Sequence, residues 1–190
     1  MNTDKARPAL ALILLWAMVF QLTAFGQRTA SASADYQVYF SPRGGATSAI
    51  VRAIEDAKSS ILVQAYSFTS EPIARAMVDA HGRGVKVQVL LDKSNRHLGY
   101  SCANRLSEAG VPTLVDAAHA IAHNKVMIID NEIVITGSFN FSRAAEERNA
   151  ENLLVIHNRE LAARYRLNWY FHEKHSKAWL KDGSHYDPHR

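Results

Sequence analysis

Cysteine is almost absent from this chain, whose 190 residues contain one, Cys102. An intrachain disulfide needs two cysteines and a zinc site of several thiolates needs more, so both are excluded. Glycine (9) and proline (5) are too few for a collagen-like or low-complexity chain. Charge of one sign is also scarce: the formal net charge is +4, which does not by itself indicate a nucleic-acid partner. The remaining composition, 47% hydrophobic and 21% charged, is that of a globular protein.

The first 34 residues have the pattern of a secretory signal peptide. Lys5 and Arg7 precede an uncharged stretch over 8–27, and small residues follow at 30–34. A positive start, a short apolar run and an A-x-A site are typical of such a peptide. We therefore expect cleavage after Ala34 and a periplasmic or secreted protein. An uncleaved membrane anchor is the alternative, because the uncharged stretch is near the ~20 residues that span a bilayer.

Residues 35–190 are predicted to form a single domain in which strands and helices alternate. Apolar residues at alternating or helical spacing predict strands over 35–40, 60–66, 85–91, 111–115, 126–129, 133–136 and 153–156, and helices over 47–58, 70–82, 104–109 and 159–178. The strand–helix–strand order favours parallel strands with helices on both faces, and a hairpin at 130–132 makes the sheet mixed. The expected fold class is α/β, with a mixed, mainly parallel sheet flanked by helices on both faces.

The candidate catalytic and binding residues lie between positions 123 and 151. His123 and Lys125 stand two apart at the start of a predicted strand, so their side chains project to one face. The loop Gly137-Ser138-Phe139-Asn140 follows the paired strand and can bring a hydroxyl, an amide and backbone N–H groups to the same sheet edge. Glu151 leads into the next strand.

These residue types suit an anionic phosphodiester. Lys125 supplies a positive charge near the phosphate oxygens, and Ser138 and Asn140 supply neutral donors. His123 supplies a group that acts as a nucleophile or a base near neutral pH. A carboxylate bonded to one ring nitrogen would fix the tautomer of the imidazole and leave the other nitrogen facing the phosphorus.

The pattern His-x-Lys-x4-Asp-x6-Gly-Ser-x-Asn, from His123 to Asn140, resembles the HKD motif of the phospholipase D superfamily at every motif position. A short chain with one motif and a signal peptide most resembles the bacterial endonuclease branch, the Nuc-type nucleases. The resemblance implies a phospholipase D-like α/β/α sandwich that cleaves DNA phosphodiesters without a metal ion or other cofactor. It also implies that His123 forms a phosphohistidine, that Lys125 and Asn140 bind the phosphate, and that Ser138 assists.

Asp130 and Glu151 compete as the carboxylate that orients His123. Asp130 follows His123 by an odd seven residues, so a regular strand would point it to the opposite face. We expect Asp130 to be structural, fixing the hairpin or pairing with a basic residue. Glu151 is preferred as the orienting residue, and the resembled family carries a glutamate there too.

One motif per chain leaves the departing oxygen without a proton donor on the far side of the phosphorus. A general acid there contributes about 10²–10⁴ in rate, and one His–Lys pair cannot occupy both sides. A twofold homodimer would bring a second copy into a shared site. We therefore expect a homodimer with one active site between two subunits and a bell-shaped pH dependence.

Three functions compete at this stage. The first is a largely sequence-nonspecific endonuclease acting on DNA, single- or double-stranded, with RNA as a further substrate. The second is a lipid phosphodiesterase of the phospholipase D type, which a retained N-terminal anchor and a membrane partner would favour. The third is a non-catalytic binding protein, which the complete motif disfavours.

Other histidines could indicate a metal, yet the sequence favours none. His119 and His123 are four apart and fit a helical metal pair, but no third ligand is evident. His172 and His175 lack the spacing of a zinc protease and are interpreted as a solvated helix face.

The remaining reactive or aromatic residues have plainer interpretations. Cys102 is expected to be an idle thiol. The aromatic run at 169–171 is assigned to core and helix packing rather than to base stacking. Arg143 and Arg148 either contact a nucleic-acid backbone or pair with the acidic residues between them.

Overall fold

A computed structural model shows the chain as a sheet covered by helices, and it describes residues 35–97 and 101–180. The predicted signal peptide at 1–34 lies outside the described residues. Within the described part, no helix is both long and apolar enough to cross a membrane.

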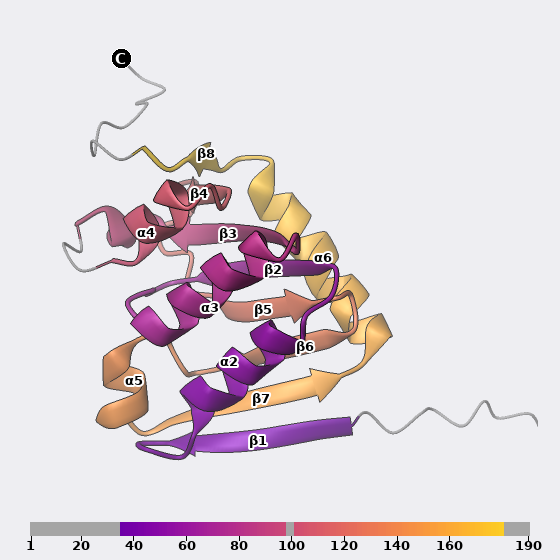
Figure 1. Cartoon of the computed structure of the whole chain (residues 1–190). Coiled ribbons are helices and arrows are strands. Elements are labelled where there is room, and N and C mark those ends of the chain that lie inside the picture. The colour runs from indigo at the N-terminus through magenta and orange to yellow at the C-terminus, as the bar shows by residue number, and fades with distance from the viewer. Residues whose placement is uncertain (1–34, 98–100, 181–190) are drawn as a thin grey trace, which may run out of the picture. The chain divides into compact units, whose positions relative to one another are not determined.

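The predicted strands and helices form close to their expected bounds (Figure 1). The strands are β1 (Asp35–Ser41), β2 (Ser60–Ala65), β3 (Lys86–Asp92), β4 (Thr113–Asp116), β5 (Lys125–Ile129), β6 (Ile133–Gly137), β7 (Glu151–His157) and β8 (Lys177–Ala178). The helices are α2 (Ala46–Asp56), α3 (Glu71–Gly82), α4 (Ala103–Glu108), α5 (Arg143–Glu147) and α6 (Arg159–Glu173), with a 3-10 turn η2 (Lys93–His97). Ser70 is the N-cap of α3, and a proline stands in the first turn, where a missing N–H breaks no helical hydrogen bond.

The eight strands form one mixed sheet in the order β1-β7-β6-β5-β2-β3-β4-β8. The pairs β2–β3 and β3–β4 are parallel, as the strand–helix–strand pattern predicts. The expectation of a mainly parallel sheet is wrong, because the other five neighbouring pairs are antiparallel. The physical reason lies in β1 and β5: β1 crosses to the far edge to pair with β7, and the β5–β6 hairpin packs against β2 in the opposite direction.

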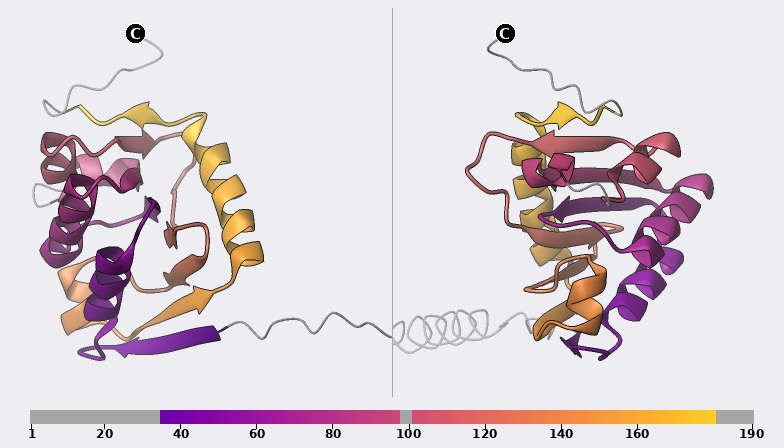
Figure 2. Two further views of the ribbon diagram at one scale, coloured as in Figure 1. Left: turned by 45° about the vertical axis from the view of Figure 1, so that its right-hand side comes forward. Right: turned by 90° about the vertical axis from the view of Figure 1, so that its left-hand side faces the viewer.

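Helices cover both faces of the sheet, as Figure 2 shows for α6 on one side and α2 and α3 on the other. Central strands such as β5 are buried throughout, which explains their continuous apolar sequence. Alternate residues serve two cores: Met127 packs into the core under α2 and α3, whereas Val126 and Ile128 pack with Trp169 of α6. The two cores cover the two faces of the sheet, so polar side chains are accommodated at the ends of the strands.

The chain differs from expectation at its C-terminal side. The helix predicted to run to residue 178 ends at Glu173, and β8 then pairs with β4. The short helix α5 was not predicted from the apolar spacing. Ser142 caps it by accepting a hydrogen bond from the Ala145 N–H. The pairing of β8 with β4 brings the end of α6 to the end of β4.

Candidate active site

The motif residues other than Asp130 meet at one end of the strands, because the strands that carry them alternate in direction. Lys125, the first residue of β5, is paired with Ala65, the last residue of β2. Gly137, the last residue of β6, is paired with Leu153, near the start of β7. The strand ends that carry Lys125, the 137–140 loop and Glu151 therefore share this edge, as the sequence predicts.

His123 is an exposed side chain held beside an aromatic ring. Its imidazole centroid lies 4.5 Å from that of Tyr66, and the Tyr66 N–H donates to the Asn124 carbonyl at 2.8 Å. The backbone around His123 is thus fixed to the end of β2, while the ring itself stays reachable from solvent. Such a ring can approach a phosphodiester that lies across the sheet edge.

Lys125 is buried, and its ammonium group lies beside His123 and the Tyr66 ring. The Lys125 Nζ donates to the His123 carbonyl at 3.0 Å and lies 4.9 Å from the centre of the Tyr66 ring. Burial lowers the pKa of Lys125, and the charge of Glu151 opposes this by raising it. A desolvated cation interacts more strongly with an anion than a hydrated one does, so the site is suited to a phosphate.

Glu151 lies on the side of Lys125 rather than in contact with His123. Its carboxylate accepts from the Asn149 Nδ2 at 3.1 Å, and its backbone N–H donates to the Ser41 Oγ at 3.2 Å. Among the described residues, no hydrogen bond joins Glu151 to His123. The role of Glu151 as the orienting carboxylate stays a prediction.

The loop after β6 is set by a close backbone approach. Gly137 has a φ of 149°, and a Cβ there would lie 2.3 Å from the Asn152 carbonyl oxygen, so glycine is required. The Ser138 Oγ accepts from the backbone and side-chain N–H groups of Asn152 at 3.1 and 3.3 Å. The Asn140 Oδ1 is buried and has no partner among the described residues, so this amide is not used to hold the loop.

Asp130 lies at the opposite end of β5, in the turn of the hairpin. It is five positions from Lys125, which is roughly 17 Å along a strand. Its carboxylate accepts from the backbone N–H groups of Lys58, Ser59 and Ser60 at 2.7–3.0 Å and from the Ser59 hydroxyl. Burial raises the pKa of Asp130, but these hydrogen bonds outweigh it and lower the pKa overall. The contacts join the hairpin to the start of β2.

One of the two arginines after the motif forms the ion pair that was one of its two interpretations. The Arg143 Nε pairs with a Glu147 oxygen at 2.8 Å on the exposed face of α5. Glu146 instead accepts from the Thr47 N–H at 2.8 Å and holds the start of α2. Arg148 is exposed next to the β7 side of the site and stays a prediction as a backbone contact.

Cys102 has the surroundings of an idle thiol. It is buried, and its Sγ lies 3.8 Å from the Glu71 carboxylate. Burial and then the Glu71 charge raise the pKa of Cys102 to about 12. The thiol is therefore protonated at neutral pH and is a poor nucleophile.

The aromatic run at the end of α6 is only partly core. Trp169 is fully buried and donates its indole N–H to the Val63 carbonyl at 2.9 Å, as expected for packing. Phe171 is 60% exposed and is not a core residue, but its ring packs edge-on against His172 and His175. The helix turns this residue outward, because the buried face of α6 is occupied by Ala162 and Trp169.

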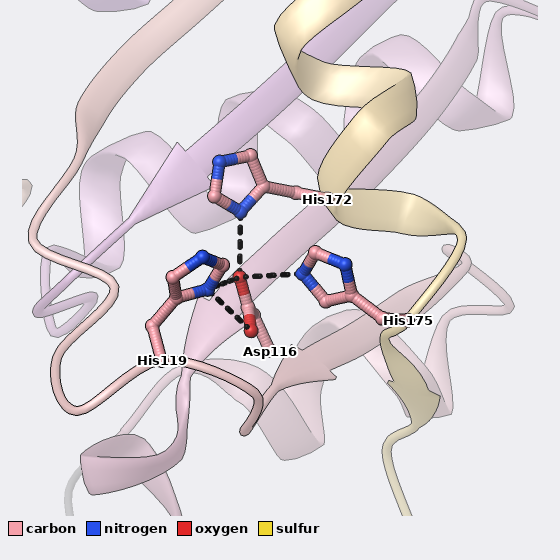
Figure 3. Close-up of side chains that lie close together, drawn as sticks. All are labelled: Asp116, His119, His172 and His175. Carbon is pink, nitrogen blue, oxygen red and sulfur yellow. Dashed lines mark hydrogen bonds and ion pairs between the residues drawn. The ribbon is translucent and has the colours of Figure 1, made fainter.

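A second polar group, missed by sequence reasoning, lies at the end of β4 (Figure 3). We call it the histidine–aspartate cluster; its members are Asp116, His119, His172 and His175. His172 is only 12% exposed and donates to Asp116, so the interpretation as a solvated helix face is wrong. The helical pair with His123 is also wrong, since residues 117–124 form a loop and His119 turns to Asp116 instead. The spacings Asp-x2-His and His-x2-His could have indicated this cluster, but 52 residues separate the two pairs, so the sequence gives no sign that they meet.

Comparisons with known proteins agree with this geometry. Residues 50–180 match the family model described as "Cardiolipin synthase, PLD-like domain". The chain is 45% identical over 139 residues to a protein named phospholipase D from Rickettsia prowazekii, which covers 73% of this chain and 68% of that protein. The fold is similar to that of Nuc from Salmonella typhimurium (TM-score 0.75, 38% identity, 78% of this chain and all of that chain). It is also similar to NucT from Helicobacter pylori (TM-score 0.70, 26% identity, 77% of this chain and all of that chain). The chain therefore belongs to the phospholipase D superfamily, as a Nuc-type phosphodiesterase.

Proposed function

We propose that this phosphodiesterase is an endonuclease that hydrolyses DNA, with RNA as a further substrate, largely without sequence preference and without a metal ion in its chemistry. The observation that carries the proposal is the exposed His123 imidazole beside the buried Lys125 ammonium, at the start of the central strand β5. An exposed site of this kind accepts one phosphodiester within a long polymer. Contacts to phosphate alone position the substrate without reading its bases.

The proposed chemistry has two displacements at phosphorus. A neutral His123 ring nitrogen attacks the phosphorus, a P–N bond forms, and the bond to the leaving oxygen breaks. Lys125 offsets the negative charge on the phosphate oxygens, with Ser138 and Asn140 as neutral donors. Water then attacks the phosphohistidine, the P–N bond breaks, and His123 is restored.

The leaving oxygen needs a proton from the far side of the phosphorus. We propose that a second copy of the chain supplies it, in a homodimer with one shared site. One His123 attacks while the other, protonated, donates; the second then accepts the proton of the attacking water. Mass under native conditions checks the dimer, and a fully active monomer would contradict the shared site.

Residues 1–34 are proposed to direct the protein to the periplasm or the medium. The support is the sequence pattern alone: a basic start, an apolar run and an A-x-A site. N-terminal sequencing of the native protein tests it. A start after Ala34 agrees with cleavage, and an intact N-terminus contradicts it.

The test of the proposed function is plasmid nicking by the purified protein in excess EDTA, beside the variant His123→Ala. The expected result is cleavage that survives EDTA and disappears in the variant. Cleavage that EDTA abolishes and a metal restores, in a protein whose fold EDTA leaves intact, would contradict histidine chemistry.

A lipid phosphodiesterase is the second candidate, because the Rickettsia relative bears the name phospholipase D. The same residues would act, and the substrate would be a phospholipid headgroup. The nicking assay is therefore run beside phosphatidylcholine vesicles. Headgroup release without DNA cleavage would replace the endonuclease with this alternative.

A further inference from the structure

The histidine–aspartate cluster is built from three separate segments that the motif site does not use. Asp116 ends β4, His119 lies in the following loop, His172 lies in the last turn of α6, and His175 lies in the turn that follows α6 (Figure 3). The two histidines are three residues apart, and both lie on the face of this helix end that is turned toward Asp116. The β8–β4 pairing, with Val115 opposite Lys177, brings that face to Asp116.

Three ring nitrogens converge on one carboxylate oxygen. The Asp116 Oδ2 lies 2.7 Å from the His172 Nδ1, 3.1 Å from the His119 Nδ1 and 3.3 Å from the His175 Nε2. One carboxylate oxygen offers about two lone-pair positions, so three donors are more than it accommodates well. The three rings are also close together, with centroids 4.9–5.4 Å apart.

We propose that the histidine–aspartate cluster binds one divalent transition-metal ion, with Zn²⁺ as the best-fitting ion. One donor atom from each residue lies within 4.8 Å of all the others. Tetrahedral zinc, with bonds of about 2.0–2.1 Å, holds its donors about 3.3–3.4 Å apart. The Asp116 Oδ2 already lies 2.7–3.3 Å from all three ring nitrogens, which is close to that spacing.

The donor types select the ion. Imidazole nitrogens suit zinc and its neighbours, whereas calcium and magnesium prefer all-oxygen sites. Four protein donors complete a tetrahedron and leave no position for water or substrate, which is the arrangement of structural zinc sites rather than catalytic ones. The proposed role is therefore structural and does not replace the chemistry of His123.

The surroundings hold the donors in place. The Asp116 Oδ1 accepts from the Ala118 N–H at 3.0 Å, which fixes the carboxylate plane. The His119 carbonyl accepts from the Lys93 Nζ at 2.9 Å, and the Ala122 N–H donates to an Asp92 oxygen at 2.7 Å. The first contact orients a ligand side chain, which favours metal binding, and the other two fix the backbone of the loop that carries His119.

A metal here would secure the loop that leads to His123. The loop runs from Asp116 to Lys125, so a bound ion fixes its beginning while β5 fixes its end. In a chain with one cysteine, the ion would join α6, β4 and this loop as a disulfide does elsewhere. The cluster stands three strand spacings, about 14 Å, from Lys125 along the sheet edge.

The test is zinc stoichiometry of the full chain, expressed without a histidine tag, stripped with EDTA, reloaded with Zn²⁺ and desalted. We expect one zinc ion per chain by elemental analysis. Zinc at about 100 times its dissociation constant should raise the Tm by roughly 5–10 °C. Co²⁺ in place of zinc should give the visible absorption of a four-coordinate ion.

The matched variants are His172→Ala/His175→Ala, which removes two donors, and His157→Ala, which removes an exposed histidine of β7 outside the cluster. The first should lose the zinc and the Tm shift, and the second should keep both. His119→Ala, at the most exposed donor, covers the case in which the double variant does not fold. Its zinc affinity should fall at least ten-fold.

A wild-type chain that holds no zinc and melts at the same temperature with and without it would overturn the proposal. Zinc that remains at one per chain in the folded double variant would place the ion elsewhere and overturn it too. None of these readouts requires catalysis, so the result stands apart from the nuclease assay.

Discussion

Two groups of polar side chains lie along the same edge of the sheet, and they differ in how many of their atoms already have partners. In the motif site, His123 is exposed and the Asn140 Oδ1 is buried without a partner among the described residues. In the histidine–aspartate cluster, donors and acceptor face one another and His172 is nearly enclosed. The open group therefore suits the proposed binding of a substrate, and the closed group suits the proposed structural role.

The largest expected effect comes from removing the histidine of the motif site. His123→Ala should reduce DNA cleavage about 10³-fold or more, because the nucleophile is lost. Its free energy of unfolding should stay within about 0.5 kcal/mol of the wild type, since the side chain is exposed. Nicking rates and urea denaturation measure the two effects. A large loss of stability with retained cleavage would reverse the comparison.

Lys125→Met separates charge from packing within the open group. Methionine keeps the length of the side chain and removes the ammonium group, so cleavage should fall about 10²–10³-fold. Stability should be unchanged or slightly higher, because the cost of burying a charge disappears. The check is kcat/KM together with the midpoint of urea unfolding. A loss of more than about 2 kcal/mol of stability would make Lys125 a structural residue.

Gly137→Ala tests the backbone on which the open group rests. The added Cβ would meet the Asn152 carbonyl, so β7 must shift and about 2–4 kcal/mol of stability should be lost. Gly82→Ala is the control, since a Cβ at the end of α3 meets no atom within 4 Å. The control should be neutral or stabilised by up to about 1 kcal/mol. Equal effects of the two changes would contradict the close approach.

His172→Ala sharpens the closed side of the comparison. The change leaves the buried Asp116 carboxylate without its shortest contact, so about 2–3 kcal/mol of stability should be lost even without metal. The cleavage rate of the protein that remains folded should change little. Thermal melting and nicking at a temperature below the transition measure both. A loss of cleavage as large as that of His123→Ala would place the cluster in the chemistry.

Asp130→Asn has the smallest expected effect and depends on pH. The folded pKa of Asp130 is lowered, so its carboxylate contributes stability above its unfolded pKa of about 4, and this is lost as pH falls through the folded value. The variant should cost about 1–2 kcal/mol at pH 7. Its stability should then depend less on pH below about 4. Urea midpoints across this range provide the measurement, and parallel curves for both proteins would contradict it.

The fold could be predicted from local patterns but not from long-range pairing. Strands such as β2 and β3 and the helix α3 between them follow from apolar periodicity and caps, and their parallel pairing follows from their order. The position of β1 does not, because its partner β7 lies 110 positions away in the register Ser41–Glu151. Nothing local records that a strand will cross to the far edge of a sheet.

The two polar groups differ in the same way. His123, Lys125, Ser138 and Asn140 fall within 18 residues, on one hairpin and its loop, so spacing alone places them at one sheet edge. The histidine–aspartate cluster depends on β8 turning back onto β4 after a helix that ends earlier than its apolar pattern suggests. Neighbouring residues on one hairpin can be placed from the sequence, whereas the contact between the segments of the histidine–aspartate cluster depends on the tertiary fold.

The stereochemical course at phosphorus tests the central claim, nucleophilic attack by His123, most directly. A DNA substrate with one phosphorothioate of known configuration is cleaved in isotopically labelled water, and the configuration of the product is determined. Each in-line displacement inverts the phosphorus, so attack by His123 followed by water gives overall retention. Inversion would mean that water attacks directly, and the phosphohistidine account would be wrong.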